Sequence, residues 1–258
     1  MIKRTMNIKT RIKQTGFTLI ELAIVLVIVG VLIGSFIGSL TQRIENSRIA
    51  ETEDQLEEIK TALLGYAYTN GHLPCPDCFL GGPLCPGAPL DSGDGAEDRN
   101  VSVCSSGNNV GTLPWVTLGL AQGDAWGTRY RYWVDTNYAN NATTFTLTPP
   151  AGPPGGGQIW NRTDDGTAIQ PLANSIVAVI FSHGKNTYGG MSTGGIATPA
   201  IPAVNLDEKD NWNGNKIFIS RPPSAAGATT AGGEFDDILT WITEFELKAK
   251  MVEAGRLP

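Results

Sequence analysis

Residues Leu22 to Leu40 read LAIVLVIVGVLIGSFIGSL, and this apolar run decides how the rest of the chain is interpreted. It contains no charged residue and only two serines. As a helix rising about 1.5 Å per residue, it would span close to the ~30 Å hydrocarbon core of a bilayer. No second run of this kind follows, so the sequence predicts at most one membrane-spanning segment.

Charge is distributed unevenly on the two sides of the run. Five basic residues and no acidic residue precede Phe17, which leaves 14 basic against 25 acidic residues in the rest of the 258-residue chain. By the positive-inside rule, residues 1–16 would lie in the cytoplasm and the long C-terminal part outside it. A chain this acidic is a poor general nucleic-acid binder, because phosphate contacts need clustered lysine and arginine.

Two simple interpretations of the apolar run each leave something unexplained. A cleaved secretory signal has a shorter apolar region followed by small residues, whereas sequence without turn residues continues beyond Leu40. A plain membrane anchor fits the hydropathy but does not account for Glu21, a carboxylate at the start of the run. A carboxylate near a bilayer is costly, so it usually has a partner and a function.

The stretch Gly16-Phe-Thr-Leu-Ile-Glu21, between a basic leader and an apolar run, resembles the processing signal of type IV prepilins and type II secretion pseudopilins. The resemblance implies cleavage between Gly16 and Phe17 by the prepilin peptidase, followed by methylation of the new Phe17 amine. It also implies that Glu21 pairs with the Phe17 amine of a neighbouring subunit, which would set the register between subunits. The simpler alternative is that Glu21 reaches the lipid headgroups.

Gly30, Gly34 and Gly38 recur at every fourth position and therefore share one helix face. Small residues at this spacing let helices approach closely in lipid, which favours the packing of many copies. Local flexibility is the alternative, because each glycine costs a helix about 1 kcal/mol. Related filaments often have a proline near the position of Gly38 that helps melt the helix, so the resemblance leaves the extent of unwinding open.

The helix is expected to continue beyond the membrane and to pack on a head. An apolar stripe of helical period runs through Ile49, Leu56, Ile59, Leu63 and Tyr66. Asn70-Gly71 is the predicted stop. The resemblance implies the same architecture, an α+β fold in which a long N-terminal helix packs on a head with an antiparallel β-sheet, in the shape of a lollipop. The predicted divisions are a cleaved leader at 1–16, a transmembrane and assembly helix at 17–40, its amphipathic continuation at 41–70 and a head at 71–258.

Within the head, the sequence predicts a β-sheet over about 128–220 and a C-terminal helix over about 235–253. β-branched and aromatic residues are concentrated at 130–134, 144–148, 175–181 and 216–220. The helix is expected from an apolar stripe formed by Phe235, Ile238, Ile242, Phe245, Ala249 and Val252. This stripe either packs on the head's own sheet or forms a seam for another subunit.

Two stretches of the head also resemble major pseudopilins. Residues 124–132, DAWGTRYRY, match an Asp-x-Trp-Gly-x-x-Tyr-x-Tyr stretch of that family. Residues 181–186, FSHGKN, lie where the family has a Ser-x-Gly-x-Asp turn before a variable loop that is sometimes bound to calcium. The loop that follows here, from Thr187 to Trp212, is long and differently spaced, so the family's ligands do not carry over to it.

All four cysteines lie in a segment rich in proline and glycine, at Cys75, Cys78, Cys85 and Cys104. Outside the cytoplasm they would form disulfides, and four cysteines allow three pairings. We expect Cys78–Cys85 nested inside Cys75–Cys104, because a Cys75–Cys78 bridge would close a small strained ring. Zinc is the alternative, although the spacings do not repeat as paired knuckles.

Two groups of oxygen-bearing side chains are candidate calcium ligands. The first comprises Asp91, Asp94, Glu97 and Asp98, and the second Asn205, Asp207 and Asp210 together with Glu208. Hard oxygen ligands on tight turns suit calcium, but the EF-hand spacing is absent. Solvated acidic loops are the alternative. The sequence requires no cofactor, and calcium is a possible ligand of these groups.

The sequence predicts a structural protein rather than an enzyme. Residues 190–194, GMSTG, match a nucleophile-elbow pattern, but glycine- and proline-rich sequence follows where that motif needs a helix. We expect a subunit of a type IV pilus-like filament or a type II secretion pseudopilus, with one pass through the inner membrane and a periplasmic or, after assembly, extracellular head. Its expected partners are the prepilin peptidase, other pilin or pseudopilin subunits and an inner-membrane assembly platform.

The size of the chain and its cysteine loop favour a minor or specialised subunit over a major one. The alternative is a binding module at a filament tip, an adhesin that holds a ligand or a surface. The six tryptophans would be its means of binding. A cluster of exposed tryptophans would favour this alternative, and a buried set would favour a scaffold.

Overall fold

The computed structural model describes residues 18–78, 93–100, 103–104, 109–141, 146–147, 156–163, 167–227 and 231–257, apart from the side chains of residues 34–39, 100 and 103. The chain divides into two units, Met1–Ser47 and Arg48–Pro258. Its described elements are, in chain order, α1 (Leu19–Asn70), β1 (Arg99–Asn100), β2 (Val103–Cys104), β3 (Val110–Thr112), α2 (Trp115–Leu118), β4 (Arg131–Val134), α3 (Thr136–Ala139), β5 (Gly157–Arg162), β6 (Ile169–Ser182), α4 (Leu206–Asn213), β7 (Ile217–Ile219), β8 (Ile238–Thr243) and α5 (Glu244–Glu253).

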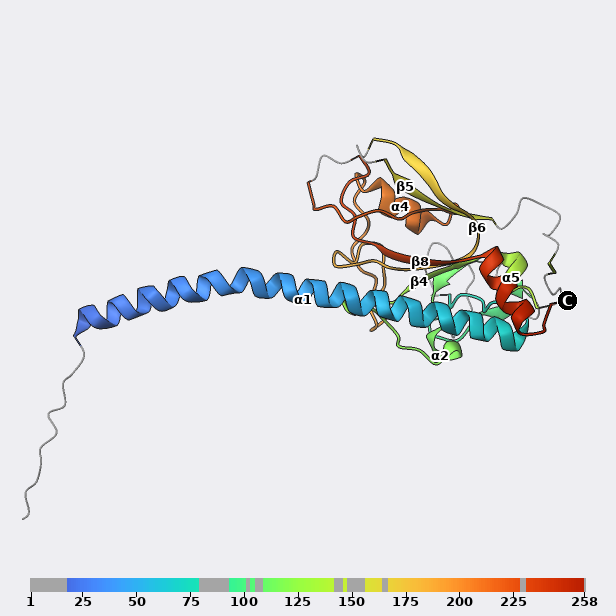
Figure 1. Ribbon diagram of the computed structural model, residues 1–258, viewed down its shortest axis with the longest axis horizontal. Coiled ribbons are helices and arrows are strands. Elements are labelled where there is room, and N and C mark those ends of the chain that lie inside the picture. Colours follow the sequence, from blue (N-terminus) through green and yellow to red (C-terminus); the bar gives the residue numbers. More distant parts are fainter. Residues whose placement is uncertain are drawn as a thin grey trace, which may run out of the picture. The chain divides into compact units, whose positions relative to one another are not determined.

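Helix α1 is continuous from Leu19 to Asn70 (Figure 1). Gly71 ends it in the left-handed conformation, with a φ of 82°, and its N–H donates to the carbonyl of Ala67 at 2.8 Å. The predicted stop is therefore confirmed, and the helix is unbroken at Gly38. Among the described residues, a set that leaves out the side chains of 34–39, no helix is long and apolar enough to cross a membrane.

The head contains a six-stranded sheet in the order β3-β4-β6-β5-β7, and β8 also pairs with β6. The first half of the long strand β6 pairs with β5, and its second half lies between β4 and β8, all antiparallel. Figure 1 shows these strands side by side. One pair, β5 with β7, is parallel, because the chain returns through β6, a long loop and α4 before it forms β7.

The predicted α+β fold is therefore confirmed, with one parallel strand pair that the sequence did not reveal. The strands predicted at 130–134, 175–181 and 216–220 correspond to β4, β6 and β7. Most of the strand predicted at 144–148 lies outside the described residues, and the described part, 146–147, is not in a strand.

Both faces of the sheet are covered by apolar side chains. One face contacts α1 through a buried cluster that includes Leu56, Ile59 and Leu63 of the predicted stripe. On this face the hydroxyl of Tyr130 donates to Oε1 of Gln55 at 2.6 Å, which ties the sheet to the helix. The opposite face has its own cluster, formed by Val110, Trp133, Ile159, Ile176, Val179, Phe181 and Phe218. The expected packing of the helix on the sheet is thus present.

The C-terminal helix begins later than predicted. Residues 238–243 form strand β8, and α5 begins at Glu244. The sequence ILTWIT is rich in β-branched and aromatic residues, and β6 offers it an edge with which to pair. Thr243 then caps the helix, because its hydroxyl oxygen accepts the N–H of Glu246 at 3.1 Å.

The change from strand to helix divides the predicted apolar stripe. Its first part is in the core, where Phe235 and Ile242 are fully buried. Its last three residues, Phe245, Ala249 and Val252, are exposed. A single helix would have kept all these residues on one side. Side chains alternate between two faces along a strand, so the residues of α5 no longer share a face with those of β8.

Cys75 and Cys104 form a disulfide across 29 residues, as predicted. A bridge of this span contributes on the order of 3 kcal/mol by constraining the unfolded chain. It leaves neither sulfur available as a zinc ligand. Cys78 is disulfide-bonded as well. Cys85 lies outside the described residues, so the Cys78–Cys85 bridge stays a prediction.

Candidate functional site

The first turn of α1 holds Glu21 in a capping box with Thr18. The N–H and the hydroxyl of Thr18 donate to Oε2 of Glu21 at 2.9 and 2.8 Å, and the N–H of Glu21 donates to the Thr18 hydroxyl at 3.3 Å. These bonds satisfy free donors at the helix N-terminus, where a negative charge is also favoured by the helix dipole. Glu21 thus has a partner within its own chain, which the Thr-x-x-Glu spacing would have revealed.

The other predicted assembly residues are only partly described. Gly16 and Phe17 lie outside the described residues, so the pairing of Glu21 with a neighbour's Phe17 amine stays a prediction. Gly30, Gly34 and Gly38 all lie within α1 and share one face by helical periodicity. Apart from its chain neighbours and the backbone of the helix itself, no described atom lies within 4 Å of the position that a Cβ would take at Gly30.

The two head stretches that resemble pseudopilins meet in the structure. Oδ2 of Asp124 accepts the hydroxyl of Ser182 at 2.6 Å, while Oδ1 accepts the N–H groups of Trp126 and Thr128. The same Ser182 oxygen accepts the N–H of Gly184 at 3.0 Å. One buried carboxylate therefore holds the turn before β4 against the turn after β6.

Three carboxylates converge just beyond this second turn. Glu208 of α4, Asp236 and Asp237 each place an oxygen within 4.8 Å of the others, and they form the one such group found in the described part of the chain. Glu208 and Asp237 are 2% and 8% exposed. Oδ1 of Asp236 is buried without a hydrogen-bond partner among the described residues. An oxygen-only donor set with an unsatisfied atom fits a hard cation such as calcium.

The turn after β6 and the neighbouring helix α4 position these carboxylates. The backbone N–H of Asn186 donates to Oδ2 of Asp236 at 2.8 Å, and its side-chain amide donates to Oε1 of Glu208 at 2.6 Å. Gly184 has a φ of 58°, and a Cβ there would come within 2.3 Å of the Asp236 carbonyl oxygen. Only glycine allows this close approach.

Burial and mutual repulsion shape the electrostatics of the cluster. Burial raises the pKa of Asp236 to about 7, and the charges of Glu208 and Glu234 act in the same direction against hydrogen bonds from the Asn186 backbone. Burial also raises the pKa of Asp237 well above its usual range, and it raises that of Glu208. The cluster therefore binds protons readily, which is the expected behaviour of carboxylates that are buried close to one another.

The first predicted calcium group is not brought together. Asp91 lies outside the described residues, and Asp94 caps a turn by accepting the N–H of Ala96. Glu97 accepts the hydroxyl of Tyr66, the N–H of Cys75 and the guanidinium of Arg99. Asp98 accepts the N–H of Cys78. Glu97 and Asp98 thus hold the cysteine loop in place.

The second predicted group separates into different roles. Asn205 donates to Glu208 at 2.9 Å and so supports the acidic cluster from outside. Asp210 accepts the side-chain amides of Asn213 and Asn215 at 3.3 and 3.5 Å. The carboxylate of Asp207 forms ion pairs with two arginines instead of joining the acidic cluster. Of the candidate residues, only Glu208 belongs to the group that the structure assembles.

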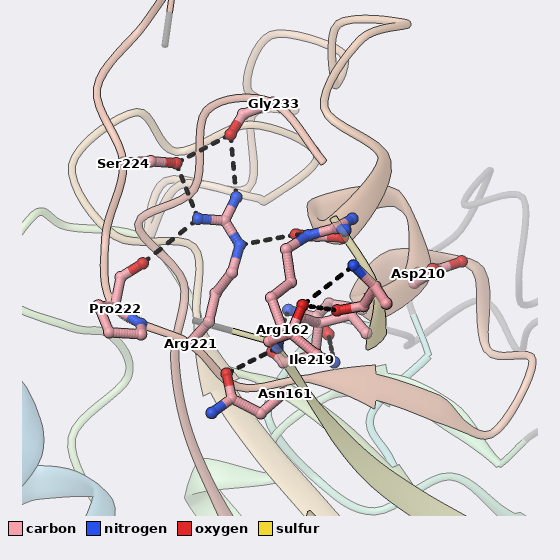
Figure 2. Close-up of polar contacts among 12 residues, drawn as sticks. Asn161, Arg162, Asp210, Ile219, Arg221, Pro222, Ser224 and Gly233 are labelled. Carbon is pink, nitrogen blue, oxygen red and sulfur yellow. Dashed lines mark hydrogen bonds and ion pairs between the residues drawn. The ribbon is translucent and has the colours of Figure 1, made fainter. Parts of the chain in front are cut away.

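Asp207 joins three segments of the head through its two oxygens. Nε of Arg162 in β5 and Nε of Arg221, which follows β7, both donate to Oδ2 at 2.6 Å, and Nη2 of Arg162 bonds Oδ1. Figure 2 shows Arg221 extending further to Ser224, Pro222 and Gly233, where it donates to the Ser224 hydroxyl and to both carbonyls. The carboxylate is 1% exposed, so this network lies within the head.

Neither the tryptophans nor the nucleophile-elbow pattern forms a surface site. All six tryptophans are described and none is exposed; Trp115 and Trp133 are buried and the others half-buried. Ser192 forms an isolated β-bridge with Thr128 and is followed by a turn rather than by the helix that the motif needs. His183 is fully enclosed, and its burial lowers its pKa to about 3, which removes it as a base at neutral pH.

A family model matches the N-terminal segment of the chain. Residues 11–37 match the family model described as the prokaryotic N-terminal methylation motif, and this match includes Gly16, Phe17 and Glu21. This match supports a relationship to the type IV pilin and pseudopilin family. The motif points to a structural subunit, and it implies processing by a prepilin peptidase and assembly with other pilin subunits. No curated protein and no solved structure matches the chain.

Proposed function

We propose that this pilin-family protein is a structural subunit of a type IV pilus-like filament or a type II secretion pseudopilus, assembled through its N-terminal helix. The methylation motif at residues 11–37 carries this proposal, because it stands at the start of the continuous helix α1. The disulfide-bonded α+β head that follows supports it.

In this proposal residues 17–40 anchor the subunit in the inner membrane by a single pass before assembly. The uncharged run from Leu22 to Leu40 and the basic leader support this placement. The Cys75–Cys104 disulfide supports a periplasmic or extracellular head, since such bonds persist outside the cytoplasm. An inner-membrane assembly platform extracts the subunit into the filament.

The proposed role is that of a scaffold, in a minor or specialised subunit. Because none of the tryptophans is exposed, their placement supports a scaffold over a tip adhesin that binds through these rings. The long cysteine-containing loop and the size of the head support specialisation, because both add surface beyond the sheet that packs on α1.

Mass spectrometry of the protein purified from its native membrane tests the processing step. We expect a mature N-terminus at Phe17 carrying one methyl group. Replacing Gly16 with leucine places a side chain at the cleavage site, and this variant should retain its leader and stay out of filaments. An intact N-terminus at Met1, or a cut beyond residue 40, would contradict the proposed function.

We further propose that Glu208, Asp236 and Asp237 bind a calcium ion that fixes the loop after β6 to α4. The oxygen-only donor set and the unsatisfied Oδ1 of Asp236 support this proposal. The ion would replace the protons that these crowded carboxyl groups bind readily, so its effect is on the stability of the head rather than on chemistry.

Thermal unfolding of the full-length protein in detergent, with calcium or with a chelator, tests this second proposal. At a calcium concentration of about 100 times the dissociation constant, binding should stabilise the folded state by about 2.7 kcal/mol. Glu208→Gln should abolish the calcium-dependent shift. Asp94→Asn, an exposed control from the first predicted group, should preserve it. Equal unfolding temperatures with calcium and chelator would refute the site.

A further inference from the structure

One edge of β6 has no partner strand in the described part of the chain. Ile176 has Gly157 of β5 and Thr243 of β8 opposite it, so β5 and β8 lie on opposite sides of β6. Strand β8 ends at Thr243, and no described strand continues along its side of β6 over residues 169–175. An open edge of this kind offers unpaired N–H and C=O groups to a strand of another chain.

The composition of β6 makes this edge prone to such pairing. Ile169 and Leu172 are 41% and 53% exposed, and Gln170 and Pro171 between them are exposed as well. The whole strand contains no charged residue, and its second half is rich in valine and isoleucine. Uncharged segments with high β-propensity associate when their edges are open, and many proteins prevent this with a lysine or another charge on the edge. Strand β6 lacks that protection.

Pro171 lies on the open edge at a position where it blocks pairing. Opposite it in β5 is Trp160, whose carbonyl accepts the N–H of Ser220 on the β7 side at 2.8 Å. The backbone groups of Trp160 therefore point away from β6, and in such an antiparallel pair those of the opposite residue point outward too. Pro171 has no N–H, so an added strand would lose a hydrogen bond there. The native sheet loses none.

Two irregularities bend the same edge. The register between β5 and β6 shifts by one residue at Leu172, which has no opposite residue in β5, and it shifts again between Ala173 and Ile176. Ser175 lies within the second shift and has a φ of 59°, which is uncommon for a residue with a side chain. Bulges of this kind bend and twist a strand, and they interrupt the regular spacing that a partner strand requires.

We propose that Pro171 and the two bulges keep the open edge of β6 from pairing with the same edge of a second copy. An antiparallel arrangement with two-fold symmetry would let this edge pair with itself, because each copy presents the same residues to the other. Such pairing is most favourable where many heads are held close together, as on a membrane surface. The inference applies to the head of any copy and is independent of the proposed filament function.

Restoring the missing donor tests this inference. Pro171→Val supplies an N–H on the open edge together with a side chain that favours strands. For the full-length protein in detergent, we expect light scattering during size-exclusion chromatography to give at least twice the wild-type protein mass per particle. Pro171→Thr supplies the same donor and should also double the mass. Since the side chain is exposed and the sheet needs no N–H here, both variants should unfold at the wild-type temperature.

Two controls separate edge pairing from a general effect of losing a proline. Pro171→Lys restores the same N–H but adds a charge of the kind that protects open edges, so it should keep the wild-type mass. Pro223→Val changes an exposed proline that lies outside the strands, and it should also keep the wild-type mass. A doubled mass in either control would overturn the inference, because the open edge would then not be the cause.

A cysteine at position 170 tests the geometry of the pairing. When residue 169 of one copy bonds residue 171 of the other, the two residues at position 170 lie directly opposite, with Cβ atoms about 4.5–5.5 Å apart. This separation is close to that of a disulfide. Gln170→Cys combined with Pro171→Val should form a covalent dimer after mild oxidation, whereas Gln170→Cys alone should not. The described native cysteines are all disulfide-bonded, and Pro171→Val without the new cysteine is the blank.

The remaining outcomes are equally decisive. Wild-type mass in both Pro171→Val and Pro171→Thr, at wild-type unfolding temperatures, would show that the proline does not protect the edge. A doubled mass without a disulfide at position 170 would overturn the self-pairing of β6 with a second copy. Neither result bears on processing at Phe17, which tests the proposed function separately.

Discussion

Glu21→Ala is expected to leave membrane insertion intact and to abolish incorporation into filaments. Insertion depends on the uncharged run from Leu22 to Leu40, and replacing the carboxylate before this run with alanine only lengthens the apolar segment. Incorporation would be lost because the Phe17 amine of a neighbouring subunit would have no carboxylate with which to pair in a medium of low dielectric constant. Membrane fractionation followed by immunoblotting of sheared filaments measures the two effects separately.

The capping box makes a sharper design possible. Thr18→Ala removes the hydroxyl bonded to Glu21 but keeps the carboxylate, and it should cost the helix about 1 kcal/mol and still assemble. Glu21→Gln keeps the hydrogen-bonding shape but removes the charge, and it should fail to assemble like alanine. If Thr18→Ala fails as completely as Glu21→Ala, the role of Glu21 is that of a helix cap. Normal incorporation of Glu21→Ala would remove the assigned role altogether.

Asp207→Ala is expected to destabilise the head by about 3–5 kcal/mol, because it removes the buried carboxylate that pairs with both Arg162 and Arg221. Arg162 and Arg221 have side chains only 11% and 4% exposed, so water cannot replace the lost carboxylate. The substitution also disconnects α4 from β5 and from the segment after β7. Urea unfolding of the full-length protein, followed by tryptophan fluorescence, measures the change in the free energy of unfolding.

Asp210, three residues further along α4, is the control. Among the described residues it bonds two asparagine side chains at long distances, and Asp210→Ala should cost less than 1 kcal/mol. Asp207→Asn, which retains one oxygen acceptor for the guanidinium groups, should fall between the two. Equal stabilities of the Asp207→Ala and Asp210→Ala variants would show that the arginine network contributes little to folding.

Local signals in the sequence were sufficient to predict α1 and the residue at which it ends. Its apolar stripe has helical period, its stop is an Asn-Gly pair, and both features act over a few residues. The Cys75–Cys104 pairing was also predicted, because a short ring at Cys75–Cys78 was disfavoured. The capping box between Thr18 and Glu21 was equally local and was missed only because Glu21 was considered as a partner for another chain.

The acidic cluster could be recognised only in the tertiary structure. Glu208 and the pair Asp236-Asp237 are separated along the chain by β7 and a long loop, and no spacing rule connects them. The two predicted calcium groups instead followed runs of acidic residues in the sequence. In the structure these residues cap turns, hold the segment around the cysteines or, in the case of Asp207, pair with two arginines. Carboxylates adjacent in sequence repel one another, so folding directs them to different donors.

By itself the sequence determined the processing signal, the long helix and the α+β class of this chain, because each follows from composition and periodicity over neighbouring residues. Only the tertiary structure decided that 238–243 is a strand, that β5 and β7 run parallel, and that Phe245 faces outward. Each of these outcomes depends on which strand edge or core surface was free to accept the segment, and that is set by contacts between distant parts of the chain.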